Sequence, residues 1–513
     1  RSLCLTSAFR EVLDRHAPER LKIVKNTHRQ ALPKKVIAML REKRESRKNL
    51  LNKNLSQQER HVLFMKFKKL RNRVTTLIRQ HKTDKFKAEL QKGKNAYKVV
   101  NDLLDMKKEN SDRISLIDNG IELKSDKDVA ECLNDFFPEK IKELKKTIDP
   151  MQKRDPLQKL RQRFPNQYKK FSFSHVNTRE VRRVISKMKN THSAGTDGIS
   201  TFYLKMVADE VTPVLTELIN TSLRVGNFPD CFKVAKITAL WKKKGDKTNK
   251  AMYRPISGLQ LFGKIIESIV DCQLRKYCER HNLFGKNQHG FRKSRSCSSA
   301  MIATYSNLRL EKMNKKWQGI LCFDLSAAYD TVDPDLLLEK AKLCGFDGSA
   351  LAWLKSYITG RKQAVKIGTY IAQPIDLDCG IPQGSACSCL LFILYVGDFE
   401  EWVSAKHNIY ADDCMISLAG DSPEEVIKRL QEEANKVFQF YASNNLICNA
   451  SKTAFMMISP KKRVNIERFQ IVLRGEVIEE IDDEQLLGLQ LQNDLKWNKL
   501  LKKINCKINY GLY

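Results

Sequence analysis

Two adjacent acidic residues, Asp412 and Asp413, could hold a metal ion. They follow Tyr410-Ala411 and lie between short apolar runs, a pattern that predicts a β-hairpin with the acids at its tip. Neighbouring carboxylates repel each other, so a fold that holds them together usually has a cation to bind. A solvated surface turn is the alternative for an isolated Asp-Asp pair, so the interpretation depends on residues elsewhere in the chain.

A third acid, Asp324, stands far upstream at the end of the apolar run Gly319 to Phe323. This run predicts a buried central strand with the acid at its exit. The chain must then turn at Ser326 to Tyr329, where backbone N–H groups suit phosphate oxygens. The ring of Tyr329 could lie beneath the sugar of a bound nucleotide and exclude a 2′-hydroxyl by its bulk, and core packing is the alternative for that ring.

A stretch before these residues predicts a hairpin that carries cations. Ala235 to Leu240 alternates apolar and polar residues as a strand does, Lys242 to Gly245 is a basic turn, and Arg254 stands beside a rigid proline. Cations on one hairpin can point at one place, and a triphosphate is a suitable target. Later in the chain, Gly380 to Ser385 predicts a rigid loop in which Gln383 offers both a donor and an acceptor.

The composition points to a polyanionic partner. Lys and Arg number 92 against 59 Asp and Glu in 513 residues, a net charge of +33, and such an excess most often serves nucleic acid. Residues 1–110 carry +19 of this excess. A nucleic-acid-contacting arm and a solvated charged helix surface are both compatible with that concentration of charge. The length leaves room for two or three domains.

Residues 1 to about 110 are predicted to be almost wholly helical. Ser56 to Glu59 is a capping box, and apolar residues recur after it at spacings of four and three. The apolar stripe comprises Leu63, Phe67, Leu70, Val74 and Leu77, with most of the Lys and Arg residues off it. Pro150 to Pro165 is interpreted as a linker, and from Val181 onwards helices and strands alternate.

The 14 cysteines are scattered, with no pairing of Cys-x2-Cys against a second Cys or His pair. The pattern supports neither a zinc site nor a disulfide framework, and reduced thiols in an intracellular compartment fit best. The longest apolar run, Leu390 to Val396, is too short to cross a bilayer, and no signal peptide is visible. Because the chain begins at Arg1 and stops after a helix-like pattern at Tyr513, we expect it to be a fragment.

Taken in order, the motifs of this chain resemble those of reverse transcriptases, and more narrowly those of non-LTR (LINE-type) retrotransposons. The resemblance covers about residues 180–510. The motifs that carry it are Ser193 to Gly198, Tyr253 to Ser257, Gln288 to Arg292, Phe323 to Asp330, Gly360 to Val365, Gly380 to Ser385, Tyr410 to Asp413, Asn449 to Thr453 and Leu487-Gly488. The chain departs from the family pattern at Ser388-Cys389, where Gly-Pro is frequent, and at Gly397, where Asn is usual.

The resemblance implies an α+β fold, a right-hand polymerase with palm and fingers and an α-helical basic N-terminal extension. The implied boundaries are 1–165 for the extension and linker, 166–480 for fingers and palm, and 481–513 for the primer-grip region and the start of a truncated thumb. An upstream endonuclease and most of the thumb would be missing.

The resemblance also implies roles for individual residues. Asp324, Asp412 and Asp413 would hold two Mg²⁺ ions, with Mn²⁺ as an alternative, helped by the carbonyl of Leu325. Lys243 and Arg254 would bind the triphosphate, together with the N–H groups of Ala327 and Ala328. Tyr329 would select the sugar, and Gln383 would contact the nucleotide and the template. Lys452 would protonate pyrophosphate, and Leu487 and Gly488 would belong to a primer grip.

The implied partners are an RNA template, a DNA primer and deoxynucleoside triphosphates, with no membrane involved. The implied reaction is RNA-directed DNA synthesis during target-primed reverse transcription, in an element-encoded ribonucleoprotein of cytoplasm and nucleus. A catalytically inactive nucleic-acid-binding relic and a group II intron-type reverse transcriptase are the alternatives. An RNA-templated RNA polymerase is disfavoured by Ala411 and Tyr329, since such enzymes usually have Gly-Asp-Asp at the hairpin and lack a bulky sugar gate.

Overall fold

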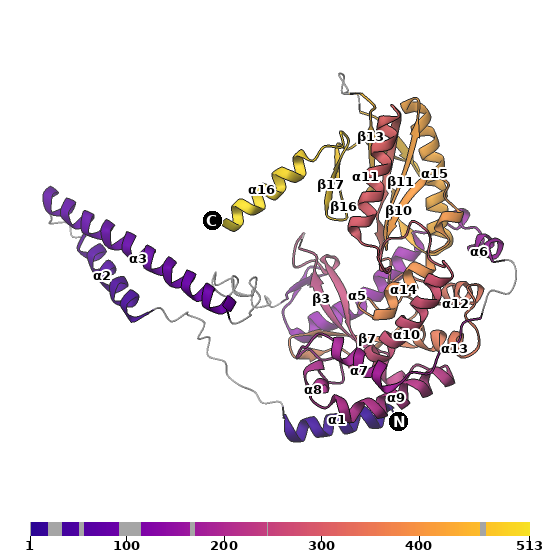
Figure 1. Ribbon diagram of the computed structural model, residues 1–513, viewed down its shortest axis with the longest axis horizontal. Helices are drawn as coiled ribbons and strands as arrows, with labels where there is room; N and C mark the ends of the chain where they lie inside the picture. The colour runs from indigo at the N-terminus through magenta and orange to yellow at the C-terminus, as the bar shows by residue number, and fades with distance from the viewer. Residues whose placement is uncertain are drawn as a thin grey trace. The chain divides into compact units, whose positions relative to one another are not determined.

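The computed structural model describes residues 2–18, 33–50, 56–91, 114–164, 170–243, 245–461 and 468–512. Within these ranges the protein has a mixed helix and sheet fold (Figure 1). It divides into two compact units, one comprising residues 1–16 and 114–513 and the other residues 17–113. Parts of the predicted helical region, residues 19–32, 51–55 and 92–110, lie outside the described residues, as does Lys244 of the predicted basic turn.

The smaller unit contains α2 (Lys34–Leu50) and α3 (Gln57–Gln91). The predicted capping box is confirmed, because Glu59 N donates to Ser56 Oγ (3.3 Å) and Ser56 N donates to Glu59 Oε2 (3.0 Å). The predicted apolar stripe on α3 is the less exposed side of the helix, with Val74 buried. The neighbouring basic residues Lys68 and Arg71 are exposed, so α3 buries one side and presents a basic one.

The larger unit contains an antiparallel sheet in the order β10-β11-β5-β13. Its strands are β10 (Lys406–Tyr410), β11 (Asp413–Gly420), β5 (Trp317–Phe323) and β13 (Ala454–Ile458). The predicted central strand is confirmed, since β5 lies between β11 and β13. Helix α15 (Pro423–Ser443) packs on one face. Gly319 permits this, because a Cβ there would lie 2.9 Å from side-chain atoms of both Leu430 and Val426.

The other face of this sheet is covered by α11 (Cys297–Met313) and by the hairpin of β16 (Asp483–Leu486) and β17 (Leu489–Gln492). Met301 and Leu308 of α11 pack there with Leu486 and Leu491 of the hairpin. Three further pairs of short strands are antiparallel: β6 (Leu325–Ser326) with β12 (Ile447–Cys448), β14 (Gln470–Leu473) with β15 (Glu476–Glu479), and β1 (Leu116–Asp118) with β2 (Ile121–Leu123).

A second sheet runs in the order β4-β3-β7-β8, with β9 also paired to β7. Its strands are β3 (Val234–Trp241), β4 (Tyr253–Gly258), β7 (Arg361–Ile367), β8 (Tyr370–Ile371) and β9 (Ile375–Leu377). β3 and β4 form the predicted antiparallel hairpin. Helix α5 (Asp126–Lys146) packs against this sheet through Val129, Leu133 and Phe137, and it is longer than the helix predicted over Val129 to Phe137.

Helices enclose the main hydrophobic core of the larger unit. They are α1 (Ser2–His16), α6 (Gln158–Arg163), α7 (Thr178–Lys187), α8 (Thr201–Met206), α9 (Ala208–Val225), α10 (Leu261–Arg280), α12 (Pro334–Leu343), α13 (Gly348–Ile358) and α14 (Ala386–Tyr395), while α16 (Asn498–Leu512) follows β17. The linker predicted over Pro150 to Pro165 is wrong for the described residues 150–164, because Leu160 belongs to this core and Leu157 is also buried. Pro165 lies outside the described residues. No helix within the described ranges has the length and apolarity needed to span a membrane.

Candidate active site

The acidic hairpin predicted from the sequence is present. β10 and β11 pair up to Tyr410 opposite Asp413, so Ala411 and Asp412 form a two-residue turn. Ala411 has φ +58°, in the left-handed region that tight hairpin turns require. Asp413 is exposed and Asp412 is half-buried. The acids therefore lie at the tip of the hairpin, as predicted.

Asp324 is brought next to this tip. Cys414 of β11 stands opposite Phe323 of β5, which places the next residue of one strand, Asp324, across from the preceding residue of the other, Asp413. The side chain of Asp324 is 56% exposed. Asp324 and the Asp412-Asp413 pair, which are distant in sequence, thus lie at the same end of the sheet.

Burial and neighbouring charge raise the pKa values of the two acids at the hairpin tip. Although Asp413 is exposed, nearby protein partly desolvates its carboxylate. This desolvation and the charges of Asp412 and Asp324 raise the pKa of Asp413 to about 6. Burial and the charge of Asp324 also raise the pKa of Asp412, whereas Arg254 opposes the rise. A bound cation would relieve this repulsion.

The donor set suits a hard divalent cation. Carboxylates and a backbone carbonyl, such as that of Leu325 directly after Asp324, are the oxygen ligands that Mg²⁺ prefers. In the part of the chain that the structure describes, no three His, Cys, Asp or Glu side chains are gathered closely enough to form a finished metal cluster. The residues fit the ion by chemistry and charge, and their side chains would have to move to complete a coordination shell.

Lys452 lies beside one of these carboxylates, that of Asp324. Its Nζ lies 3.6 Å from Asp324 Oδ2, and both side chains are more than half exposed. Lys452 ends a short 3-10 helix, Ala450–Lys452, which the side chain of Asn449 caps by accepting from Ser451 N at 3.0 Å. This local cap sets the direction in which Lys452 leaves the backbone.

Tyr329 is half-buried beside the acids, and its ring stacks on Phe392 with centroids 4.9 Å apart. Burial raises its pKa, and the thiol of Cys389 and the charge of Asp412 contribute to the rise. The ring therefore has one packed face, and its hydroxyl end lies within electrostatic reach of the acids. This position is compatible with core packing and with contact to a nucleotide.

The turn before Tyr329 and the Gly380 to Ser385 loop are held together. Ile381 N donates to Tyr329 O at 2.9 Å, and Gly380 N donates to Val332 O at 2.8 Å. A Cβ at Gly380 would lie 2.8 Å from Asp330 O, and Gly380 has φ +89°, so only glycine fits this close approach. The loop continues to Gln383, whose carbonyl accepts from Ser257 N of β4 at 3.1 Å.

The remaining predicted residues occupy the surrounding elements. Arg254 on β4 is exposed, and its charge lowers the pKa of Asp412. Lys243 is exposed in the turn after β3 and has φ +58°. Ala327 has φ +52° and its carbonyl accepts from Asp330 N at 2.9 Å, and Ala328 is buried. Leu487 and Gly488, both with positive φ, form the tight turn between β16 and β17.

Two residues that the sequence did not single out belong to this region. Lys140 of α5 is half-buried; burial lowers its pKa, Asp330 opposes that effect, and the positive charges of Lys452 and Arg254 add to it. Burial also raises the pKa of Asp330 to about 6. Asp330 stands within the sequence motif around Asp324, so the sequence contained a signal for its place near the site. Lys140 carries no local signal, because it comes from a helix distant in sequence.

A buried acid supports the loop that carries Gln383. Glu267 of α10 is 1% exposed, and it accepts from Ser385 Oγ at 2.8 Å and from Tyr357 OH at 3.2 Å. Burial raises its pKa, while the nearby charge of Arg361 and these hydrogen bonds oppose the rise. The loop is therefore held in place by hydrogen bonds between Ser385 and buried polar side chains of the core.

Carboxylates at the ends of two neighbouring antiparallel strands, faced by cationic side chains, define a site suited to metal-assisted phosphoryl transfer. Residues 241–491 match the family model described as "Reverse transcriptase (RNA-dependent DNA polymerase)", and the chain carries a domain of this family. The resemblance recognised in the sequence is confirmed. Reverse transcriptases generally use divalent metal ions.

The chain is also similar to curated retrotransposon proteins. It is 23% identical over 334 residues to the "Probable RNA-directed DNA polymerase from transposon X-element" of Drosophila melanogaster, and 26% identical over 341 residues to the "RNA-directed DNA polymerase from mobile element jockey" of the same species. The jockey protein of Drosophila funebris is 25% identical over 333 residues. These matches cover 63–64% of this chain and 36–37% of the relatives. The chain thus spans little more than a third of their length.

Replacing Asp413 by Asn should stabilise the metal-free protein at neutral pH. Because the folded-state pKa of about 6 lies above the ordinary value of 3.8, the folded protein binds this proton more tightly than the unfolded chain, and the free energy of unfolding falls as pH rises from about 4 to 6. In a chelator at pH 7 we expect the variant to melt about 1–2 °C higher than the wild type, a small shift because the group is solvent-screened.

Thermal melts at two pH values check this expectation. At pH 4 the two proteins should melt alike, because the carboxyl group is largely protonated in the wild type. Excess Mg²⁺ at pH 7 should stabilise the wild type more than the variant. An Asp413→Asn protein that melts lower than the wild type at pH 7 in chelator would contradict the repulsion described above.

Proposed function

We propose that this chain is the RNA-directed DNA polymerase of a non-LTR retrotransposon, acting during target-primed reverse transcription. The observation that carries the proposal is the meeting of Asp324, Asp412 and Asp413 at one end of the β10-β11-β5-β13 sheet, within the matched reverse transcriptase segment. The reaction joins a deoxynucleotide to a primer 3′-hydroxyl and releases pyrophosphate. The RNA template, DNA primer and deoxynucleoside triphosphates follow from this assignment.

The three acids and the carbonyl of Leu325 would hold two divalent ions, which supply a lowered pKa for the primer hydroxyl and neutralisation of the phosphates. The protein's own part is positioning and charge, because phosphoryl transfer demands little else. Arg254 and Lys243 would bind the triphosphate from the β3–β4 hairpin. The N–H groups of Ala327 and Ala328 would bind phosphate oxygens at the turn.

Other residues would control the proton and the substrate. Lys452 Nζ, already drawn towards the site by Asp324, would donate a proton to the leaving pyrophosphate. The stacked ring of Tyr329 would lie against the deoxyribose and exclude a 2′-hydroxyl. Gln383, tied to β4 through its carbonyl, would contact the incoming nucleotide and template, and the turn at Leu487-Gly488 would hold the primer.

Lys140 would add a further cation for the triphosphate. Its pKa is affected by the charges of Arg254, Lys452 and Asp330, so these four charged groups lie in the same region. The residue is half-buried, and burial lowers its pKa, so its charge is less screened by water than that of a fully exposed lysine. Helix α5 would in this way contribute to nucleotide binding although it lies before the matched segment.

We assign the β10-β11-β5-β13 sheet to a palm and the β4-β3-β7-β8 sheet with α5 to fingers. The proposed boundaries remain 1–165 for the basic extension, 166–480 for fingers and palm, and 481–513 for the primer-grip region and the start of a thumb. The basic side of α3 would follow a nucleic-acid backbone, which makes binding salt-sensitive. The proposed setting is an element-encoded ribonucleoprotein of cytoplasm and nucleus.

Replacing Asp412 by Asn should lower Mg²⁺-dependent incorporation of deoxynucleotides on an RNA template by about a hundredfold or more, because a charged ligand at the reacting centre is lost. Primer extension measures this. Asp421→Asn is the matched control, since Asp421 follows the other end of β11 and pairs with Lys316 at 2.6 Å. Incorporation that survives Asp412→Asn would refute the proposed site.

Replacing Tyr329 by Ala should admit ribonucleotides. Loss of the ring opens space for a 2′-hydroxyl, and we expect the ratio of kcat/KM for a deoxynucleotide over its ribonucleotide to fall at least about tenfold. Tyr329→Phe keeps the ring that stacks on Phe392 and should keep the selectivity. Equal selectivity in the Ala variant and the wild type would remove Tyr329 from the role of sugar gate.

Replacing Lys140 by Met should raise the KM for deoxynucleotides about fivefold, the effect of one lost interaction with a charged group, with little change in template binding. Lys146→Met is the control, because Lys146 is an exposed lysine at the end of the same helix. Steady-state primer extension at varied nucleotide concentration measures the KM of both variants and of the wild type. An unchanged KM in the Lys140 variant would place its charge outside nucleotide binding.

A further inference from the structure

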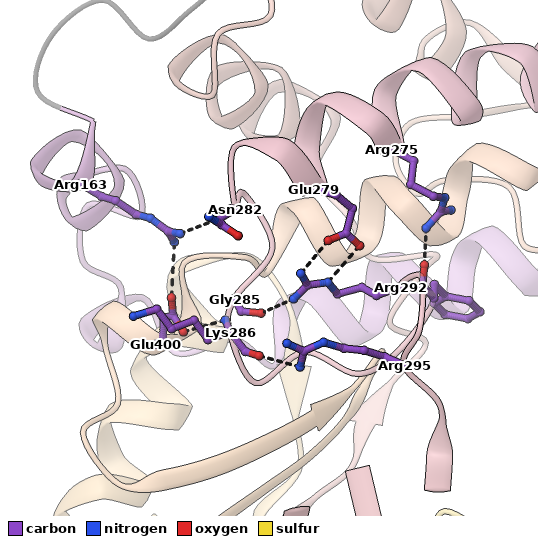
Figure 2. Close-up of polar contacts among 10 residues, drawn as sticks. Arg163, Arg275, Glu279, Asn282, Gly285, Lys286, Arg292, Arg295 and Glu400 are labelled. Atoms are coloured by element: carbon purple, nitrogen blue, oxygen red, sulfur yellow. Dashed lines mark hydrogen bonds and ion pairs between the residues drawn. The ribbon is translucent and has the colours of Figure 1, made fainter. Parts of the chain in front are cut away.

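Residues 281–296 connect α10 to α11 and form neither a helix nor a paired strand, yet side chains brace them at several points (Figure 2). Arg292 makes two hydrogen bonds to Glu279 (3.1 and 2.7 Å) and a third to Gly285 O at 2.9 Å. Arg295 donates to Lys286 O at 2.7 Å. Bidentate pairs of this kind fix orientation as well as distance.

The loop is also tied to its other neighbours. Lys286 N donates to Glu400 Oε2 at 2.9 Å, and Arg163 of α6 donates to Asn282 O at 2.6 Å and lies 3.8 Å from the carboxylate of Glu400 (Figure 2). Arg275 of α10 donates to Phe291 O. These contacts come from separate elements, so the loop is held as a rigid piece.

The braced loop lies against the outer edge of β10. His289 N donates to Ile409 O at 2.7 Å, and Ile409 N donates to Asn287 O at 3.0 Å, which forms a parallel bridge between Gln288 and Ile409. The loop thus follows β10 towards its end, where the acidic turn begins.

At that end a side chain of the loop holds the turn itself. Gln288 is 3% exposed, and its Oε1 accepts from Gly290 N at 2.7 Å and from Ala411 N at 3.0 Å. Ala411 is the left-handed residue of the turn, a conformation that an L-residue adopts only at an energetic cost. A fixed acceptor for its N–H favours this conformation.

The contact between loop and turn is close enough to demand a glycine. A Cβ at Gly290 would lie 2.4 Å from Ala411 N and 3.1 Å from Ala411 Cα. Its backbone is not in the left-handed region, so space alone is the reason. Gly285, in the same loop, would place a Cβ at an ordinary 3.5 Å from Gly397 O.

We propose that Gln288 is a positioning residue for the acidic pair: it holds the Ala411 N–H, and so sets the direction in which Asp412 and Asp413 point towards Asp324. The proposal rests on the polymerase function proposed above for its consequence in catalysis. The Arg292–Glu279 pair acts through Gln288 by keeping the loop in place. Neither residue touches the reacting atoms.

Gln288→Met tests the proposal, since it keeps the length of the side chain and removes the acceptor. The matched control is Gln318→Met, a buried glutamine of β5 whose Nε2 donates to Leu308 O at 3.0 Å, at the strand end opposite Asp324. Gln288→Met loses the bonds from Gly290 N and Ala411 N, and Gln318→Met loses the bond to Leu308 O. Of these three bonds, only the one from Ala411 N involves the turn.

The first readout is amide hydrogen exchange of residues 409–413 in the protein without metal or nucleic acid. Gln288→Met should exchange about fivefold faster there than the wild type, as expected for one lost hydrogen bond, whereas Gln318→Met should not. Gln288→Glu keeps an acceptor oxygen at the same reach and should retain slow exchange. Gly290→Ala should behave like Gln288→Met, and Gly285→Ala like the wild type.

The second readout is binding of Mn²⁺ alone, followed by its electron paramagnetic resonance signal. We expect about fivefold weaker binding in Gln288→Met and unchanged binding in Gln318→Met. Wild-type exchange and wild-type Mn²⁺ affinity in Gln288→Met would overturn the proposal while leaving the polymerase function intact. A wild type that extends no primer would overturn the function, and the exchange measurement would still decide the role of Gln288.

Discussion

The register between β5 and β11 is the constraint on which the site depends. It places Asp324 beside Asp413 and so gathers negative charges that repel one another, as the raised pKa of Asp413 shows. The energy to hold them comes from elsewhere: α15 packs closely over Gly319 on one face, and α11 with the β16–β17 hairpin covers the other. A packed sheet can tolerate this local cost because apolar burial over its two faces is much larger.

Much of the site could be predicted from the sequence, because its parts are local patterns. The β10–β11 hairpin, the strand before Asp324 and the β3–β4 hairpin each carry alternation or turn signals within a few residues. The resemblance to a family then supplied roles for residues such as Lys452, whose ion pair with Asp324 shows that it reaches the site. Each of these patterns can be recognised within one continuous segment of the sequence.

The parts that sequence reasoning missed depend on contacts between distant segments. Lys140 comes from α5, whose pattern reveals a helix but not that the charge of this lysine acts on the pKa of Asp330. Gln288 was recognised only as part of a motif, and its bond to Ala411 requires the folded loop. The departure at Gly397 has a similar explanation, because a Cβ there would lie 2.6 Å from Leu283 O. In this chain glycine suits the packing of that loop.

Three thiols close to the acidic residues have a chemical consequence. Cys414 directly follows Asp413 and is buried, and burial raises the pKa of its thiol to about 12. Burial likewise raises the pKa values of Cys322, which lies on the neighbouring strand β5 and packs on the other face of the sheet, and of Cys448 opposite Leu325. Peroxides and alkylating reagents attack the thiolate, which is scarce at such thiols. These three thiols are therefore expected to resist oxidation, and covalent labelling will report on more accessible positions such as Cys272 and Cys506.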